Sequence, residues 1–598
     1  MTHFIHKHNL QDISFLFFIT IFLTFLFQGY HFGISDQTAH NSFILKLIEI
    51  DIFNYDPIFK DEYIAQSPYV YIYSFLTKII SRDNIQLIFF ILYIISIFLI
   101  IYYSFQIGKL FALENNFNYI FILLLFFLNP FTFSSDFIII ETLKPSFLAR
   151  PFMVASFYYI FKNKYFLGIT ISLITSLIHP IIGFWTSFFS LLLVAYFSFE
   201  LKKTLLENLY VKKKKYLFII LTIFFYYIVW FNRQNLSGLS DSEFLSIYLW
   251  RTSANSNIFY FEIEQYISLI FFSIIGFLSF MYLLKNKLIN KRIFLPYFLY
   301  LTVCIICFLY ALSFTFHPTK SLVQLWPFRT FVIGKFFIIL ILTYCLQDLF
   351  NSKKINFYKL FLILIFIKLF FVFNKTSLSL FFNYFTFLFI LLFLFYNKNN
   401  NKIFLYLNAI GIIFLTFISL DLHKKTYGKN LFSFDQPIIY NSLNKRNLIS
   451  NIFNFSFDNQ KNKPIIFNSF KNYYKEYFGV CSFLHDNKIK DNLFLVPVSG
   501  HKFRYLCEKS IYFDVKTIPF GNNNLKNWAS RYQDLYNLKM NKEKWNSEYL
   551  DKEYKNITSE KLYFLKKKYN IKYALLYNET TVSNKIIYQD FFFKLIEL

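Results

Sequence analysis

Six carboxylates lie in the polar stretch 28–68, directly after the first apolar segment of the chain. They are Asp36, Glu49, Asp51, Asp56, Asp61 and Glu62. A carboxylate held at a membrane surface can act as a general base on a hydroxyl group. We select Asp36, in GISDQ, and Asp56, in YDPIF, as the catalytic candidates. The alternatives are a helix cap for Asp36 and a turn before Pro57 for Asp56, while Asp51, Asp61 and Glu62 fit a solvated loop.

Arginine and histidine residues in later loops supply the second half of this chemistry. The candidates for binding an anionic substrate group are Arg150, His179, Arg251, His317 and Arg329. The planar guanidinium group of arginine can bind two phosphate oxygens at once. Snorkelling toward lipid headgroups is the alternative for Arg150 and Arg329, and capping or packing is the alternative for His179. A base beside such cations suits transfer from a polyprenyl phosphate, because the leaving phosphate gains negative charge.

The acidic residues show no spacing typical of a metal site. We therefore predict no metal-ligating residues and no required cofactor, although a divalent cation could assist the reaction.

The rest of the chain must position these residues, and it is strongly apolar. Of 598 residues, 56% are hydrophobic, 23% are aromatic, and the mean hydropathy is +0.42. Continuous apolar runs of about 17–22 residues recur, which is the length of a membrane-spanning helix. We predict a polytopic α-helical membrane protein with about 13 transmembrane helices. The predicted spans are 13–27, 86–105, 118–133, 148–161, 165–178, 182–199, 215–231, 266–284, 294–314, 328–346, 357–373, 377–396 and 403–420. The apolar segment 69–81 is too short to cross alone, so it is re-entrant or interfacial.

The basic residues indicate the topology. Lys and Arg total 61 against 35 Asp and Glu, a formal net charge of +26. These cations cluster in links between apolar runs, at 162–164, 202–215, 285–292, 353–354 and 398–402. The positive-inside rule explains this distribution better than binding to a nucleic acid does. We expect an integral inner-membrane protein with a cytoplasmic N-terminus, a retained first helix and, after an odd number of spans, a C-terminal tail outside.

The composition becomes polar after residue 420. We predict two domains: a transmembrane domain, 1–420, and a small extracytoplasmic α/β domain, 421–598. Strand patterns occur at 464–468, 492–498, 511–515 and 573–577, and amphipathic helical patterns at 525–538 and 559–569. Cys481 and Cys507 could pair if this domain faces an oxidising compartment.

Several short motifs resemble the GT-C superfamily of integral-membrane glycosyltransferases, and most closely a group of uncharacterised bacterial membrane proteins with a C-terminal extracytoplasmic domain. The motifs are SDQTAH with NYDP, LARP at 148–151, IHPIIG at 178–183, QLWPFR at 324–329, LVPVSGHKFRYLCEKSIYFDVKTIPF at 495–520 and NWASRYQDL at 527–535. The resemblance implies that Asp36 is the catalytic carboxylate and Asp56 a second acidic residue of the same loop. The chain departs from the family pattern after Arg251, where it reads RTSANSN without histidine. Arg504, Asp514 and Lys516 in the tail fit either substrate recognition or domain packing.

These observations predict transfer of a sugar from a polyprenyl-phosphate donor to an extracytoplasmic acceptor. The expected partners are the lipid-linked donor and membrane lipid. The alternatives are a transporter or flippase for a lipid-linked or anionic substrate, and a non-catalytic membrane scaffold. A transporter would favour paired broken helices and charges within the spans; Lys335 and Lys368 are the exceptions in otherwise uncharged runs.

Overall fold

The computed structural model describes most of the N-terminal half and most of the C-terminal 123 residues, 476–598. The described residues are 2–24, 30–33, 36–49, 51–60, 68–80, 85–129, 133, 137–140, 142–200, 239–261, 263–288, 291–352, 432–433, 476–498, 500–517, 519, 522–538 and 547–598. The predicted spans 215–231, 357–373, 377–396 and 403–420 and the predicted strand 464–468 lie outside them.

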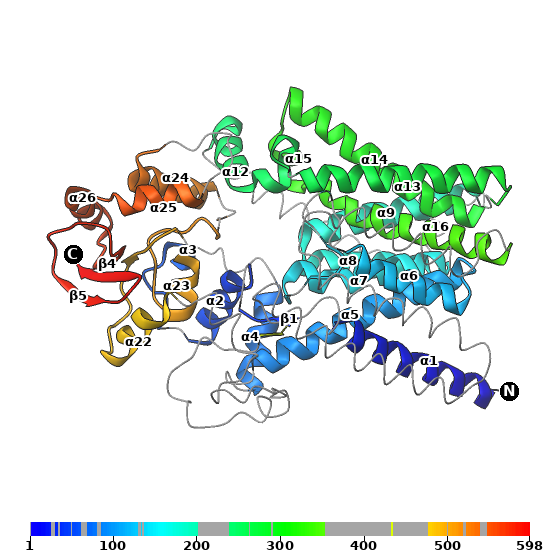
Figure 1. Ribbon diagram of the computed structural model, residues 1–598, viewed down its shortest axis with the longest axis horizontal. Helices are drawn as coiled ribbons and strands as arrows, with labels where there is room; N and C mark the ends of the chain where they lie inside the picture. Colours follow the sequence, from blue (N-terminus) through cyan, green and yellow to red (C-terminus); the bar gives the residue numbers. More distant parts are fainter. Residues whose placement is uncertain are drawn as a thin grey trace.

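A bundle of apolar helices forms one end of the molecule (Figure 1). Its described helices are α1 (Thr2–Leu23), α5 (Ile85–Leu110), α6 (Asn115–Phe127), α7 (Pro145–Phe161), α8 (Tyr165–Ile178), α9 (Pro180–Glu200), α13 (Ile263–Lys285), α14 (Lys291–Phe316) and α16 (Phe331–Asn351). Each overlaps a predicted span, because long apolar runs satisfy their backbone most simply as helices.

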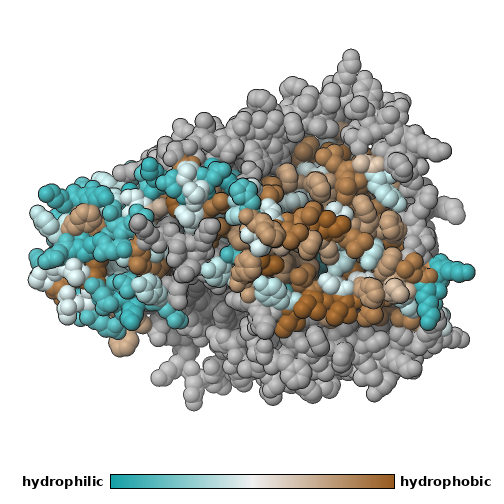
Figure 2. All heavy atoms as spheres, turned by 90° about the horizontal axis from the view of Figure 1, so that it is seen from above, coloured by the Kyte–Doolittle hydropathy of each residue, from teal (hydrophilic) through white to brown (hydrophobic). Residues whose placement is uncertain are grey.

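Five described helical segments are long and apolar enough to cross a membrane. They are Gln86–Leu110, Pro180–Phe197, Gln265–Lys285, Ile293–Phe316 and Leu322–Asn351. Side chains such as Phe277 and Phe308 are 60% and 63% exposed on the bundle, as lipid-facing residues would be. Figure 2 shows the apolar side chains gathered over the bundle and the polar ones at the opposite end. The chain therefore has the architecture of a multi-pass membrane protein, and the total of about 13 spans stays a prediction.

The described links between these helices gather at the two ends of the bundle. At the end that holds the start of α1, Lys109 pairs with Asp12 at 3.1 Å, and the Phe111 and Phe161 rings lie 5.1 Å apart. Tyr282 at the end of α13 also donates a hydrogen bond to Asp348 of α16 at 2.6 Å. The described basic links at 162–164 and 285–288 thus lie at the same end as the start of α1, away from the C-terminal unit (Figure 1).

The described parts of the first loop (residues 28–68) and the apolar segment after it form three short helices between the bundle and the C-terminal unit (Figure 1). They are α2 (Asp36–Ile48), α3 (Pro57–Lys60) and α4 (Pro68–Ile80). Helix α4 is the segment predicted not to cross. Its residues Ile72, Phe75 and Ile79 are 49%, 63% and 64% exposed and share one helical face. Such a face is typical of a helix lying at the membrane interface.

The C-terminal unit is a small mixed α/β fold. Its helices are α22 (Phe478–Asp486), α23 (Gly500–Cys507), α24 (Asn522–Tyr536), α25 (Ser547–Lys555) and α26 (Ser559–Tyr569), and its strands are β3 (Phe494–Leu495), β4 (Tyr573–Tyr577), β5 (Ile586–Gln589) and β6 (Phe593–Glu597). The sheet order is β3-β4-β6-β5; β3 is parallel to β4, and the other pairs are antiparallel. A disulfide joins Cys481 of α22 to Cys507 of α23, with Cα atoms 4.7 Å apart.

The predicted strand 511–515 is not a full strand. Tyr512 donates its N–H to the Phe494 carbonyl at 2.8 Å, which makes one bridge beside β3. The chain then turns at Asp514, whose carboxylate accepts the N–H of Thr517 at 2.7 Å. An aspartate that bonds its own downstream backbone favours a turn over a continued strand. This turn presents Lys516 to the first loop.

Helix α12 (Asp241–Ser256) lies between the predicted spans 215–231 and 266–284, where the sequence predicted no helix. It begins with a capping box: Glu243 accepts the N–H of Ser240 at 2.9 Å, and Ser240 Oγ accepts the N–H of Glu243 at 3.3 Å. Trp250 of α12 packs against Tyr532 of α24, with ring centroids 4.7 Å apart. The helix thus connects the bundle side of the molecule to the C-terminal unit.

Candidate functional site

Asp36 lies between two lysines that come from distant parts of the chain. Its Oδ2 is 2.9 Å from Lys144 Nζ, at the start of α7, and its Oδ1 is 2.7 Å from Lys516 Nζ, in the C-terminal unit. The side chains of Asp36, Lys144 and Lys516 are 43%, 22% and 27% exposed, so the cluster reaches solvent. The first loop, the bundle and the C-terminal unit therefore meet at this carboxylate.

Backbone contacts hold Asp36 and Lys144 in place. The Leu143 carbonyl accepts hydrogen bonds from Gln37 at 3.0 Å and from the Tyr69 hydroxyl at 3.1 Å. Because Gln37 follows Asp36 in α2 and Leu143 precedes Lys144, these bonds fix the two charged residues relative to one another. Tyr69 lies in the first turn of α4, so this helix supports the same arrangement.

The charges around Asp36 determine its protonation. The ammonium group of Lys144, and to a lesser extent that of Lys516, holds the pKa of Asp36 well below its usual range, although partial desolvation of the carboxylate by the surrounding protein opposes this effect. Burial lowers the pKa of the nearby His40 to about 4, against the attraction of Asp36. At neutral pH the cluster therefore contains an ionised carboxylate, two ammonium groups and a neutral imidazole.

Arg251 joins this cluster from α12. Its guanidinium donates hydrogen bonds to the backbone carbonyls of Val515 and Lys516, the latter at 3.2 Å. Burial lowers the pKa of Arg251, and the charges of Asp36 and Asp514 oppose that effect. The predicted pair Asp36 and Arg251 is thus brought together, with Arg251 also fixing the backbone that carries Lys516.

Arg329 lies beside the same helix. It follows the short helix α15 (Lys320–Leu325), and its guanidinium stacks 3.9 Å from the centroid of the Trp326 ring. Burial raises the pKa of Tyr248 in α12, while Trp326, Arg329 and Arg251 act against it. Arg329 and Arg251 therefore share Tyr248 as a neighbour. The cation–π contact keeps the Arg329 side chain in a defined position.

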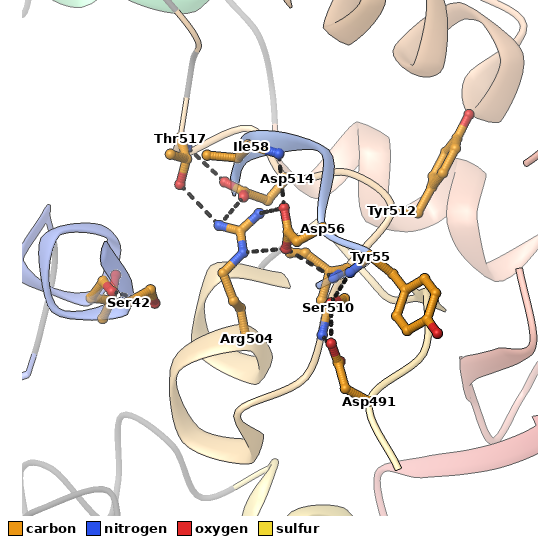
Figure 3. A network of polar contacts seen from close by, with 12 residues as sticks. Ser42, Tyr55, Asp56, Ile58, Asp491, Arg504, Ser510, Tyr512, Asp514 and Thr517 are labelled. Atoms are coloured by element: carbon orange, nitrogen blue, oxygen red, sulfur yellow. Dashed lines mark hydrogen bonds and ion pairs between the residues drawn. The ribbon is translucent and has the colours of Figure 1, made fainter. Parts of the chain in front are cut away.

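Asp56 lies in a different environment from Asp36. It is fully buried, and its Oδ2 accepts hydrogen bonds from Arg504 Nε at 2.7 Å and from the Ile511 N–H at 3.0 Å (Figure 3). Its Oδ1 accepts the Ile58 N–H at 3.1 Å. The other side of the Arg504 guanidinium pairs with Asp514 at 2.7 Å. These contacts favour a positioning role for Asp56, which ties the first loop to the C-terminal unit; its catalytic role stays a prediction.

The neighbouring contacts strengthen the same junction. The backbone N–H groups of Asn54 and Tyr55 donate to Asp491 at 2.8 Å and to Ser510 at 3.1 Å, and Ser510 Oγ in turn donates to Asp491 at 2.8 Å (Figure 3). Arg504 also donates a hydrogen bond to Thr517 at 3.2 Å. Arg504 and Asp514 thus serve domain packing, whereas Lys516, two residues after Asp514, faces Asp36.

The remaining predicted residues show no direct contact with Asp36 among the interactions of the described part of the chain. Arg150 is 1% exposed inside α7. His179 lies between α8 and α9, where its Nδ1 accepts the Ile182 N–H at 3.2 Å, as expected of a capping residue. His317 is exposed after α14. Their roles in binding stay predictions.

Lys144 and His40 were not selected as site residues from the sequence, and Lys516 was assigned to either substrate recognition or domain packing. One signal was present: His40 lies in the SDQTAH motif and Lys516 in the motif at 495–520. In the described residues, no group of three His, Cys, Asp or Glu side chains has a geometry that could hold a metal ion. The cluster itself consists of one carboxylate paired with two lysine side chains.

The comparisons with known proteins identify a domain but no activity. A family model described as a domain of unknown function (DUF6798) matches residues 476–535. This region contains Arg504, Asp514 and Lys516, so it supplies both the buried junction and one of the two lysines on Asp36. No curated protein matches the chain.

Proposed function

We propose that the chain is a membrane glycosyltransferase of the GT-C type, which moves a sugar from a polyprenyl-phosphate donor to an extracytoplasmic acceptor. The observation that carries the proposal is the solvent-reaching Asp36 carboxylate, paired with Lys144 and Lys516 and close to Arg251. A single ionised carboxylate among cations combines a base for the acceptor with a site for the phosphate of the donor.

In the proposed reaction, Asp36 accepts the proton of the acceptor hydroxyl. The acceptor oxygen forms a bond to the anomeric carbon of the sugar, and the bond between that carbon and the phosphate oxygen breaks. The electron pair leaves with the lipid phosphate, whose growing charge the nearby cations stabilise. Arg251 is the arginine with the best support for this role. Arg329 is the second candidate, because it shares the neighbour Tyr248 with Arg251.

We infer that this site faces the extracytoplasmic side of an inner membrane. The first loop and the C-terminal unit touch, so they lie on one side, and the described basic links lie at the other end of the bundle. The positive-inside rule assigns that basic end to the cytoplasm. The disulfide between Cys481 and Cys507 supports an oxidising environment for the C-terminal unit.

The test is a comparison of glycoconjugates and lipid-linked sugars by mass spectrometry. A deletion strain is complemented with the wild type, with Asp36→Asn, or with Asp51→Asn, a matched control that removes an exposed carboxylate of the same loop. At equal membrane abundance, we expect the wild type and the control to restore a glycan. Asp36→Asn should lower its formation about 100-fold or more, because a general base contributes that much to the rate.

Accumulation of the lipid-linked donor in the deletion and Asp36→Asn strains would name the substrate. Full restoration of the glycan by Asp36→Asn would show that the Asp36 carboxylate is not the catalytic base. If reconstituted vesicles moved the lipid-linked substrate across the bilayer with no covalent product, the transporter interpretation would replace this one.

A further inference from the structure

Both oxygens of the Asp36 carboxylate are occupied by ammonium groups. Oδ1 binds Lys516 and Oδ2 binds Lys144, at 2.7 and 2.9 Å. A base in this state is unsuited to accept a proton, because each cation stabilises the ionised form. The carboxylate must therefore exchange these two ion pairs for other contacts before it can accept a proton from the acceptor.

The charges of the cluster do not cancel. Lys144 and Lys516 contribute two positive charges and Asp36 one negative charge, which leaves one positive charge before Arg251 is counted. His40 adds none at neutral pH, since its pKa is about 4. Because the lysine and aspartate side chains reach solvent, this excess positive charge is accessible to a small anion.

We propose that Lys144 and Lys516 form a phosphate clamp, which pairs with Asp36 before the donor arrives and transfers to the donor phosphate when it binds. The proposal rests on the transferase function above and names the part of the site that senses the donor. A phosphate ester carrying one or two negative charges competes well for two ammonium groups held by a single carboxylate. Lysine suits this exchange because its charge lies at the end of a flexible stem.

Release of the lysines prepares the base. Once their charges move from the carboxylate to the phosphate, the pKa of Asp36 rises toward its ordinary value, and Asp36 accepts the acceptor proton more readily. Proton abstraction is thereby coupled to the presence of the donor. Without the donor, the base stays paired and the acceptor is not activated.

The clamp also gives the C-terminal unit a direct part in the reaction. Lys516 follows Asp514, which pairs with the buried Arg504, and its carbonyl accepts a hydrogen bond from Arg251. The backbone at Lys516 is thus fixed from two sides while its side chain remains partly exposed. The region 476–535 is then a component of the active site and not a separate accessory domain.

Binding of inorganic pyrophosphate tests the clamp without any enzymatic turnover. The full-length protein is placed in nanodiscs of phosphatidylcholine, and the affinity is measured by isothermal titration calorimetry for the wild type, Lys144→Ala, Lys516→Ala and Asp36→Asn. Each lysine variant should bind pyrophosphate about 10- to 100-fold more weakly, which corresponds to the loss of one charge-assisted hydrogen bond. Lys567→Ala, which removes an exposed lysine of α26 in the same unit, is the matched control and should not change the affinity.

Asp36→Asn gives the decisive result, because its effect has the opposite sign. The clamp predicts that pyrophosphate binds about tenfold more tightly to this variant, since the competing carboxylate charge is gone. A purely structural ion pair would give unchanged or weaker binding, and that result would overturn the proposal. Equal affinities of wild type and both lysine variants would overturn it as well.

Two controls distinguish the clamp from a bulk-lipid site and from the transferase function on which it rests. Including phosphatidylglycerol in the nanodisc should change the affinity by less than about twofold; strong competition would assign the lysines to a bulk lipid headgroup and overturn their role at the donor. Pyrophosphate binding of the predicted pattern with unchanged glycans in the deletion strain would retain the anion site and reject the transferase function. If the deletion strain lost a glycan but pyrophosphate bound equally well to the wild type and all variants, the transferase function would be retained and the phosphate clamp rejected.

Discussion

The buried junction around Arg504 gives a prediction whose size follows from the structure. Arg504 and Asp56 have side chains 2% and 0% exposed, and Arg504 bridges Asp56 and Asp514 at 2.7 Å each. Removing one partner of a buried ion pair costs about 3–5 kcal/mol, because the remaining charge is left without its partner. Arg504→Met leaves the two buried carboxylates of Asp56 and Asp514 without the cation they share, so we place it at the upper end of that range. Asp56→Leu leaves Arg504 paired with Asp514, so we place it at the lower end.

A second ion pair on the same helix provides the control. Lys502 of α23 contacts Glu476 at 3.2 Å, with side chains 18% and 33% exposed. Such a partly solvated pair contributes about 0–1 kcal/mol. Lys502→Met therefore removes a cation within one helical turn of Arg504 without creating a buried unpaired charge. Arg504→Met should therefore cost at least about 2 kcal/mol more free energy than Lys502→Met.

Release of the C-terminal unit from the first loop is the quantity to measure. The full-length protein in nanodiscs is equilibrated in increasing urea and then exposed briefly to trypsin, so that the cleaved fraction reports the open population. We expect the free energy of opening to fall in the order Lys502→Met, Asp56→Leu and Arg504→Met, with the last most affected. Equal opening free energies for Arg504→Met and Lys502→Met would refute the view that this network holds the two segments together.

Two further predictions concern the same C-terminal unit. Burial lowers the pKa of His501 to about 3, so the unfolded chain binds a proton that the folded chain does not, and stability is lost progressively as the pH falls from 6.5 to about 3. His501→Phe should reduce the slope of opening free energy against pH by up to about 1.4 kcal/mol per pH unit, and an unchanged slope would contradict this. Replacing Cys481 and Cys507 by serine should destabilise the unit by about 2–5 kcal/mol, and the wild type should resist alkylation until it is reduced. Rapid alkylation of both cysteines in the native, unreduced protein would contradict the disulfide.

The helices were largely predictable because each depends on one local property. Continuous apolar runs gave α5, α9, α13, α14 and α16, and the amphipathic pattern at 559–569 matches α26. Helix α12 was missed because polar residues interrupt its apolar positions, although the capping-box residues Ser240 and Glu243 marked its start. The prediction of a strand at 511–515 was wrong, because the turn made by Asp514 ends the pairing with β3 after a single bridge.

The site was only partly predictable, since its geometry depends on contacts between distant segments. Asp36 and Arg251 were selected for their residue types, and the structure brings them into one cluster. Nothing local to Lys144 or Lys516 indicates that both point to the same carboxylate. Their selection would have required knowledge that the tail folds back onto the first loop, which no composition or periodicity signal carries.

Burial separates the two acidic residues that the sequence treats alike. Asp36 and Asp56 both lie in the first loop, but Asp56 accepts four hydrogen bonds from the Arg504 guanidinium and two backbone N–H groups, whereas Asp36 reaches solvent and pairs with lysine ammonium groups. A carboxylate fixed by backbone N–H groups and arginine cannot release its partners without opening the junction. A carboxylate held by flexible lysine side chains can release them to a ligand. The positions of the two residues therefore support a division in which Asp56 joins the segments and Asp36 is available for chemistry.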